Sequence, residues 1–398
     1  MIFLTYWFFG FAAAFVPIYW LIRHSLARKL WLLAGCAVFH THFAGPAGVI
    51  PIVILGVLTY FAGRSRRGPA CLAGIVLVVG ALVMYKYTYF LAAAMLGAWR
   101  QDLGQAAVEQ ARGWLPGAPP LAISFFAFEF VHYLYDVWHG SQPIRSPLDF
   151  ALFSIFWPSI VAGPVKRYQQ FLPALVQGAS RVDPREAAEG FLRVLVGFLK
   201  KVLADSMTAA IATAVPLFDR IGVPYRWLAF TLIGFRILLD FSGYSDMAIG
   251  FARMLGVKLP ENFNWPYLAR SIPEFWQRWH ISLSTWIRDY VYIPLGGNRH
   301  GPARRVCNGL LAFALCGLWH GAAWNFILWG LYHGVGLAVS ISYRSLPAVI
   351  SQPLARMFGW TPVAWLATMA FVGWGWLIFF YPVPEALRIT RMMLGAAK

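Results

Sequence analysis

The chain has 398 residues, of which 59% are hydrophobic and 12% charged, and its mean hydropathy is +0.60. This balance excludes a soluble globular domain and predicts an all-α integral membrane protein. The net charge is +17, but the Lys and Arg residues cluster in short segments between apolar runs, as at 23–29 and 64–67. Such segments are typical of positive-inside loops. We therefore expect membrane lipid, and no nucleic acid, as a partner.

The apolar runs predict most of the membrane spans directly, because a span needs about 20 predominantly apolar residues. The first run, MIFLTYWFFGFAAAFVPIYW, lacks a basic segment before it and a small-residue cleavage site after it, so we expect a retained first span. The clear candidates are residues 2–22, 70–97, 120–138, 190–215, 226–252, 323–343 and 362–382.

Three further stretches are apolar but interrupted. Residues 30–62 are too long for one span and contain HTHFAGPAG, which predicts two helices meeting at a turn. Residues 156–167 and 306–322 are short or broken by Pro and Gly, which indicates re-entrant segments. Irregular backbone at membrane depth is tolerated only where protein buries it or water reaches it, so an internal cavity is expected nearby. We predict one membrane domain over residues 1–398, with roughly ten to twelve helical segments and its motif-bearing core at about 120–345.

The four cysteines, Cys36, Cys71, Cys307 and Cys316, stand apart in apolar stretches. They show neither a disulfide framework nor the spacing of zinc ligands. We expect them to act as small apolar side chains, with no bound metal or cofactor.

Two acidic residues, Asp240 and Asp246, lie inside the apolar run LLDFSGYSDMAIGFARMLG. A charge at bilayer depth costs about 3 kcal/mol on insertion scales, so each carboxylate needs a partner. The structural interpretation, which we favour, pairs them with Arg236, four residues before Asp240, or with Arg253. The functional alternatives are ion coupling in a transporter and orientation of a catalytic histidine.

Residues 273–297, PEFWQRWHISLSTWIRDYVYIPLGG, begin at a helix-compatible Pro273 and end at Pro294 and two glycines. The spacing predicts an amphipathic helix with polar and apolar faces, and His280 falls among the apolar residues. An aromatic and basic helix of this kind can also lie on the bilayer surface, so the segment alone leaves an interfacial anchor and a functional role open.

The stretch GLWHGAAWNFILWGLYHG contains His320 and His333, thirteen residues apart. On an unbroken helix they would lie about 220° apart, so a two-histidine metal site is not expected. No HExxH pattern is present. Cys316 precedes His320 by four residues and could form a Cys–His nucleophile, but apolar surroundings favour an inert thiol. Asn325 and the small residues beside it suit either a substrate or close helix packing.

Together, FSGYSDMAIG, LPENFNWPYLARSIPEFWQRWHISLSTWIRDYVYIPLGGNR and GLWHGAAWNFILWGLYHG resemble the membrane-bound O-acyltransferase family. Two further stretches, ISFFAFEFVHYLYDVWHG and VAGPVKRYQQF, extend the resemblance to most of residues 85–345. The motifs are most similar to the bacterial branch that acts in alginate O-acetylation, with the teichoic acid D-alanyl transferases as more distant relatives.

This resemblance implies a ring of tilted helices around a central tunnel, with catalytic roles for His320 and His280. By position, the family's WHG histidine falls on His320 and its RWHxS histidine on His280. Acyl transfer to a hydroxyl needs a base and donors for the oxyanion. We assign His320 as the base, with His280 orienting the substrate or assisting proton transfer. The expected tunnel-lining residues are Trp276, Trp319, Trp324, Asn325 and Asp246.

The expected enzyme is an O-acyltransferase of the bacterial cytoplasmic membrane. Its co-substrate would be acetyl-CoA or an acylated carrier protein, and its acceptor a hydroxyl of an exported polysaccharide or cell-envelope polymer. Two alternatives stay open: an acyl-group channel that serves a periplasmic or extracellular transferase, and D-alanyl transfer from a carrier protein.

Overall fold

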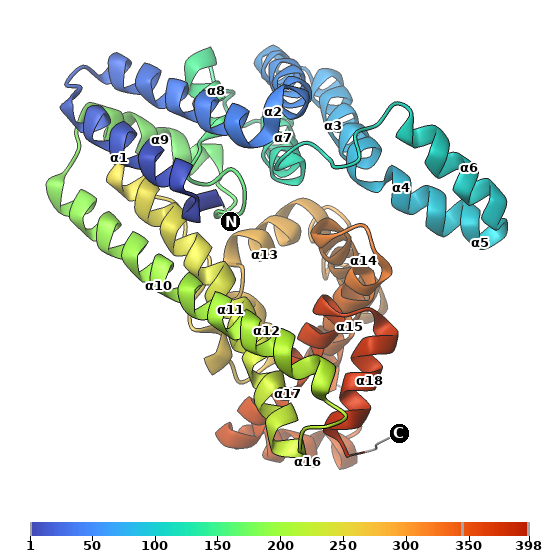
Figure 1. The fold of residues 1–398 in the computed structure, drawn as a ribbon. Helices are drawn as coiled ribbons and strands as arrows, with labels where there is room; N and C mark the ends of the chain where they lie inside the picture. The colour runs from blue at the N-terminus through green and yellow to red at the C-terminus, as the bar shows by residue number, and fades with distance from the viewer. Residues whose placement is uncertain (1, 344–345, 396–398) are drawn as a thin grey trace. The chain divides into compact units, whose positions relative to one another are not determined.

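The computed structural model describes residues 2–343 and 346–395. All regular secondary structure in these two ranges is helical, which confirms the all-α prediction (Figure 1). The chain forms two compact units. The first comprises residues 1–196 and 245–260, and the second comprises residues 197–244 and 261–398. The predictions of a single domain and of a central tunnel stay predictions.

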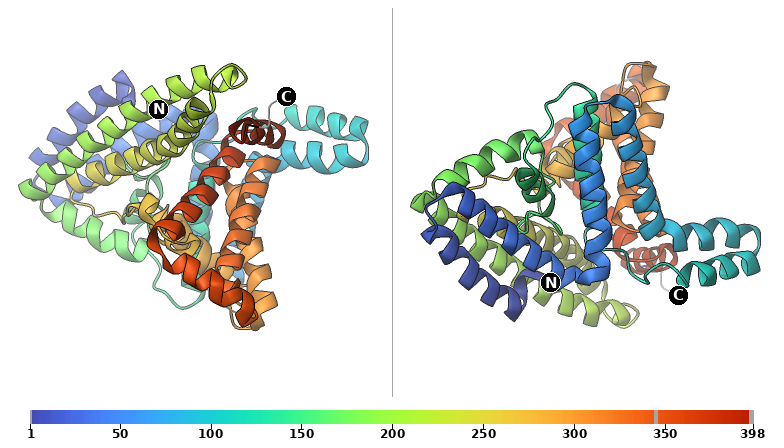
Figure 2. Two further views of the ribbon diagram at one scale, coloured as in Figure 1. Left: turned by 90° about the horizontal axis from the view of Figure 1, so that it is seen from below. Right: turned by 90° about the horizontal axis from the view of Figure 1, so that it is seen from above.

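The first unit contains nine α-helices of its own among the described residues. In this unit α2, α3 and α7 pack side by side (Figure 2). The helices are α1 (Tyr6–Leu21), α2 (Ser25–Ser65), α3 (Gly68–Leu82), α4 (Thr88–Leu91), α5 (Gly97–Trp99), α6 (Gln101–Arg112), α7 (Ile123–Trp138), α8 (Pro147–Ile155) and α9 (Tyr168–Ser180).

Two long helices contribute residues to both units, and seven more belong to the second unit. The two long helices are α10 (Pro184–Ala214) and α11 (Val223–Met254). The seven are α12 (Ile272–Arg278), α13 (Ile281–Ile287), α14 (Gly301–His320), α15 (Trp324–Ser342), α16 (Ala348–Gly359), α17 (Thr361–Phe380) and α18 (Val383–Met393).

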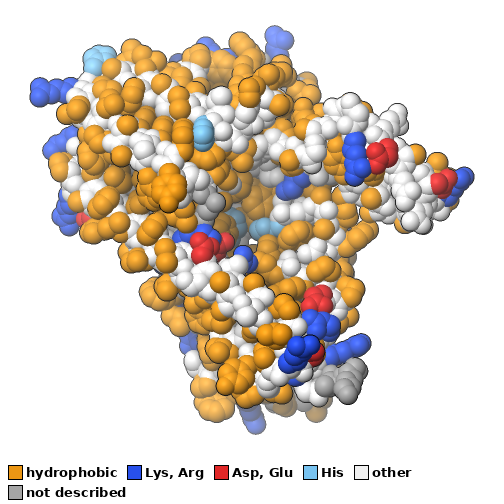
Figure 3. Space-filling view, viewed as in Figure 1, with side chains coloured by type: hydrophobic (Ala, Val, Ile, Leu, Met, Phe, Trp, Pro, Cys, Tyr) orange, Lys and Arg blue, Asp and Glu red, His pale blue; other side chains and the backbone are white. Residues whose placement is uncertain are grey.

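Five stretches of the described chain are long and apolar enough to cross a membrane: Ser25–Ser65, Gly68–Trp99, Val223–Met254, Trp324–Ser342 and Thr361–Phe380. Four of them coincide with predicted uninterrupted runs, and Ser25–Ser65 contains the interrupted stretch 30–62. The other predicted runs, 2–22, 120–138 and 190–215, fall mostly in α1, α7 and α10, which are not among the five. Large apolar side chains also point outward along α10, which in a soluble protein would be unfavourable but in lipid is expected. On the face shown in Figure 3, hydrophobic side chains cover most of the surface and the charged side chains form small groups.

Two of the three predicted interruptions lie where the sequence indicated, whereas residues 306–320 belong to the continuous helix α14 and the re-entrant character of 306–322 stays a prediction. Within α2 the backbone leaves the helical region at Gly45, where φ is 65° and ψ is 169°, so two helices meet inside HTHFAGPAG. Residues 156–167 are non-helical and mostly buried by surrounding protein. Burial in protein is the condition under which irregular backbone is tolerated in a membrane protein.

All four cysteines have free thiols, and Cys36, Cys71 and Cys316 are buried while Cys307 is exposed. Within residues 2–343 and 346–395, no three His, Cys, Asp or Glu side chains gather closely enough to hold a metal ion.

Candidate active site

The segment that carries His280 is two short helices rather than one. Ser271 caps α12, since its Oγ accepts a hydrogen bond from the Glu274 N–H at 3.3 Å. The helix ends at Arg278, and His280 adopts a left-handed conformation with φ 43° and ψ 53° before α13 begins. The prediction of a continuous helix over 273–297 was therefore wrong.

The break has a tertiary cause. The Ile281 N–H donates to the Asn262 carbonyl oxygen at 3.0 Å, and the Ser282 N–H donates to Asn262 Oδ1 at 3.3 Å. The N–H groups of Ile281 and Ser282 therefore bond to Asn262 rather than to carbonyl oxygens one turn earlier in their own segment. As a result a new helix begins here, and its first N–H groups, which have no partner within the helix, are satisfied by Asn262. The partner lies in a different segment, so periodicity within 273–297 could not reveal the break.

The second motif forms a tight helical hairpin. The helix α14 ends at His320, only three residues separate it from α15, and the two helices pack along each other (Figure 1). A Cβ at Gly317 would clash with the carbonyl oxygen of Phe326, and one at Gly330 would clash with that of Phe313. Only glycine permits this close approach of the two backbones. The unbroken helix assumed for His320 and His333 was therefore wrong, because the chain reverses between them.

The hairpin and the α12–α13 segment bring the two motif histidines together. The His280 ring centroid lies 6.2 Å from that of Trp319, and the His320 centroid lies 4.9 Å from the same indole. On another side His320 contacts Trp329 and Phe379, each at 5.2 Å between centroids. Both imidazoles thus lie in one aromatic cluster within the second unit.

His280 is the more deeply buried of the pair. Its side chain is 1% exposed, and its Nδ1 lies 3.0 Å from Asn262 Oδ1. Burial, with a smaller effect from nearby His320, holds the pKa of the His280 imidazole well below its usual range. A neutral imidazole retains a lone pair, which is the form that can accept a proton.

His333, which the resemblance did not assign to the pair, belongs to the packed core of the second unit. It is fully buried, and its ring lies 5.0 Å from Trp329 and 5.2 Å from Trp276 between centroids. Trp329 thus contacts both His320 and His333.

The other residues predicted to line a tunnel fall in different environments. Trp276 is buried, whereas Trp324 is 59% exposed at the start of α15. The Asn325 Nδ2 donates to the carbonyl oxygens of Ile378 at 3.4 Å and Phe379 at 3.1 Å. This amide therefore bonds to the end of α17.

The two intramembrane aspartates are paired, but with cations on α10 rather than with Arg236. In the second unit Asp240 Oδ1 lies 2.6 Å from Lys201 Nζ. In the first unit Asp246 Oδ1 lies 3.0 Å from Arg193 Nη2. Each carboxylate thus has a cationic partner, as the structural interpretation expects, whereas Arg253, one of the two predicted partners, pairs with Glu186 and Glu189. The predicted Arg236 partner was wrong, because sequence spacing ranks only neighbours on one helix, whereas the observed partners lie on another.

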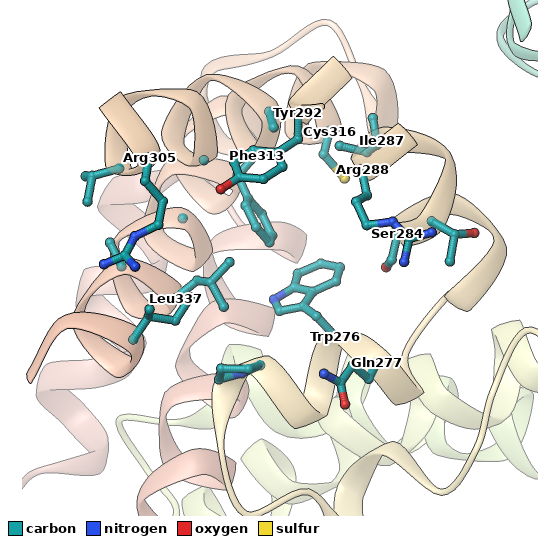
Figure 4. Close-up of a pocket in the computed structure, with 18 of the residues that line it drawn as sticks. Trp276, Gln277, Ser284, Ile287, Arg288, Tyr292, Arg305, Phe313, Cys316 and Leu337 are labelled. Atoms are coloured by element: carbon teal, nitrogen blue, oxygen red, sulfur yellow. The ribbon is translucent and has the colours of Figure 1, made fainter. Parts of the chain in front are cut away.

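An apolar cavity of about 430 Å³ lies beside the histidine segments in the second unit (Figure 4). Trp276 projects into it, and the guanidinium groups of Arg305 and Arg288 lie at opposite sides, with Arg288 paired to Asp289 at 2.7 Å. Ile281, next to His280, and Cys316, one turn before His320, form part of the wall. The remaining lining residues are Pro273, Gln277, Ser284, Thr285, Ile287, Tyr292, Val306, Gly309, Ala312, Phe313, Gly334, Leu337, Ala338 and Ile341.

Three site residues had no assigned role in the sequence analysis: Asn262, Trp329 and Arg305. Asn262 lies within the quoted motif LPENFNWPY. Its place in a family motif is the one sequence feature that could have marked it as a candidate site residue. No pattern within the chain predicted that Trp329 contacts His320 and His333 or that Arg305 lines the cavity, because helix packing alone decides both.

The fold and this site define a helical integral membrane protein in which a buried histidine, His280, and a half-buried one, His320, share an aromatic cluster. Residues 119–381 match the model of the MBOAT, membrane-bound O-acyltransferase family. The chain belongs to this family, which confirms the resemblance drawn from the motifs.

Among curated proteins, the chain is 41% identical over 263 residues to the probable alginate O-acetylase of Pseudomonas aeruginosa, covering 65% of this chain and 48% of that protein. It is 29% identical over 432 residues to the peptidoglycan O-acetyltransferase of Helicobacter pylori, covering 97% and 79%. It is also 29% identical over 277 residues to the teichoic acid D-alanyltransferase of Bacillus subtilis, covering 65% and 68%. The chain spans about half the length of the alginate relatives that it matches.

Proposed function

We propose that this protein is an O-acyltransferase of the bacterial cytoplasmic membrane that transfers an acyl group, most simply acetyl, to a hydroxyl of an exported polysaccharide or cell-envelope polymer. The observation that carries the proposal is the meeting of His280 and His320 at Trp319. The names of the relatives support the acceptor class, because all three act on envelope or exported polymers.

The cavity beside the segments that carry the histidines supports a thioester donor that carries phosphate. Its lining is mostly apolar, which suits an extended arm with an acyl group, and its arginines suit phosphate oxygens. Acetyl-CoA and an acylated carrier protein both present such an arm. We assign the cavity to the donor, which enters as a co-substrate from the cytoplasm.

The reaction follows from the two imidazoles. His320 removes the proton of the acceptor hydroxyl as its oxygen attacks the thioester carbonyl carbon. The carbon–sulfur bond of the tetrahedral intermediate then breaks, and the sulfur takes the proton from the imidazolium, giving an ester and a free thiol. His280 orients the hydroxyl beside His320. Desolvation in the aromatic cluster strengthens each of these polar interactions.

The test measures transfer of isotope-labelled acetyl groups from acetyl-CoA or an acetylated carrier protein to envelope polymer in membranes. We expect His320→Gln to reduce transfer by about 10²-fold or more, since general base catalysis typically contributes 10² to 10⁴. His300→Gln serves as the matched control, because His300 is exposed in the loop before α14. Retained transfer by the His320 variant at normal protein level would overturn the assignment of the base.

Two further outcomes decide between the proposal and its alternatives. If the purified protein exchanges acyl groups only after a periplasmic or extracellular transferase is added, the protein is an acyl-group channel. If the polymer gains D-alanyl rather than acetyl mass, the donor is a D-alanyl carrier protein.

A further inference from the structure

The side-chain oxygen of Asn262 is the meeting point of three hydrogen bonds at the start of α13. His280 Nδ1 lies 3.0 Å from Oδ1, the Ser282 N–H lies at 3.3 Å and the Ser282 Oγ at 2.9 Å. All three residues are buried, with exposures of 1%, 1% and 5% for Asn262, His280 and Ser282. Water therefore has little access to this oxygen, and protein donors satisfy it.

These contacts determine where the imidazole carries its proton. A backbone N–H can only donate, so the Asn262 atom that faces the Ser282 N–H is the carbonyl oxygen rather than the NH₂ group. A carbonyl oxygen can only accept, so the His280 Nδ1 that faces it carries hydrogen. A neutral imidazole has one N–H, and His280 Nε2 must then present its lone pair.

The opposite edge of the ring completes the argument. His280 Nε2 is buried and has no hydrogen-bond partner among the described residues. The ring lies beside Trp319, which also contacts His320. A buried acceptor without a donor is unfavourable by about 1–3 kcal/mol, and a hydrogen-bond donor of a ligand at this nitrogen would remove that cost.

We propose that Asn262 is a positioning residue that holds His280 in the Nδ1–H tautomer, so that His280 meets the acceptor hydroxyl only through the Nε2 lone pair. The same residue also fixes the backbone, because its carbonyl oxygen accepts the Ile281 N–H at 3.0 Å beside the left-handed His280. Asn262 thus sets both the ring orientation and its tautomer, as partners of catalytic or metal-binding imidazoles do elsewhere. The inference rests on the proposed function for the identity of the hydroxyl, but the tautomer does not.

The decisive readout is the tautomer itself. Protein labelled with ¹⁵N-histidine is reconstituted in bilayers, and the His280 imidazole resonances are identified as those missing from His280→Gln. We expect wild type and Asn262→Asp to show hydrogen on Nδ1, because a carboxylate also accepts from that nitrogen. Asn262→Leu removes the acceptor, so the His280 population should move to the Nε2–H form.

Acyl transfer gives the second readout. Asn262→Leu should lower kcat about 10- to 100-fold with little change in KM for the donor, a loss typical of orienting partners. Asn262→Asp should restore most of kcat. Ser282→Ala is the matched control at the same oxygen, since it removes one donor and leaves the His280 contact in place. Asn264→Leu is the control on the exposed side of the segment.

The outcomes separate the two proposals. Hydrogen on Nε2 in wild type, or an unchanged tautomer in Asn262→Leu, would overturn the role of Asn262. If Asn262→Leu does not fold, the wild-type and Asn262→Asp spectra still decide the tautomer. An Nδ1–H tautomer in a wild-type protein that transfers no acyl group supports the inference about Asn262 and contradicts the proposed function.

Discussion

The buried ion pair between Glu129 of α7 and Lys166 should contribute to stability only as an intact pair. The two side chains are 5% and 1% exposed, and Lys166 Nζ bonds to Glu129 Oε1. The ammonium group also lies 5.2 Å from the ring centroid of Phe153 and 5.7 Å from that of Phe171. Its surroundings are therefore aromatic and dry, and neither charge has water to replace its partner.

Removal of one partner leaves an uncompensated buried charge, which costs about 3–5 kcal/mol. We expect Lys166→Met and Glu129→Gln each to reduce the free energy of unfolding by an amount in this range. The double variant should be less destabilised than the two single losses added together, because no isolated charge remains. Residues in direct contact typically show interaction energies of about 0.5–3 kcal/mol in such a cycle.

The assay is reversible unfolding in mixed detergent micelles, followed by tryptophan fluorescence. The exposed pair Glu109–Arg112, with side-chain exposures of 68% and 63%, provides the control. Arg112→Met should cost less than about 1 kcal/mol, as exposed pairs usually do. A loss below about 1 kcal/mol in Lys166→Met, or strict additivity in the double variant, would refute the reasoning.

Three further predictions concern packing, charge and helix termini. Gly317→Ala should destabilise the α14–α15 hairpin by about 1–3 kcal/mol through overpacking. Gly309→Ala should be neutral or stabilising by helix propensity, because a Cβ added at Gly309 meets no atom within 4 Å. Equal stability of the two variants in micelle unfolding would contradict this prediction. Hydrogen bonds from Arg253 and a nearby lysine lower the pKa of Glu186 to about 2. The ionised carboxylate therefore stabilises the fold above the unfolded-state pKa of about 4.5, and this stabilisation is lost as the pH falls from there towards 2. Wild type should be more stable than Glu186→Gln at neutral pH and should lose this difference in acid. A stability difference that does not change with pH would contradict the role assigned to the Glu186 carboxylate. Asn325→Leu should lower the free energy of unfolding by about 1 kcal/mol, because it removes a hydrogen-bond donor to the end of α17. Acyl transfer per folded molecule should not change. Reduced transfer at wild-type stability would instead favour a substrate-lining role for Asn325.

The amino-acid sequence by itself predicted the membrane class, most of the helices and the family. Span length and apolar composition are local properties, because the bilayer requires about 20 apolar residues in a row wherever the helix lies. The kink at Gly45 and the irregular segment at 156–167 were likewise visible from Gly and Pro. The motif residues His280 and His320 could be selected because their order and spacing match a family pattern.

Tertiary structure alone decided how the site is built. The break at His280 depends on Asn262, 18 residues earlier in the chain, and no helical periodicity connects the two. Asp240 pairs with Lys201 on another helix rather than with its near neighbour Arg236. The meeting of the two histidines at Trp319 requires α14 and the α12–α13 segment to pack together. Hydrogen bonds and side-chain packing between distant segments set these features, whereas a local pattern reports only a residue's own helix.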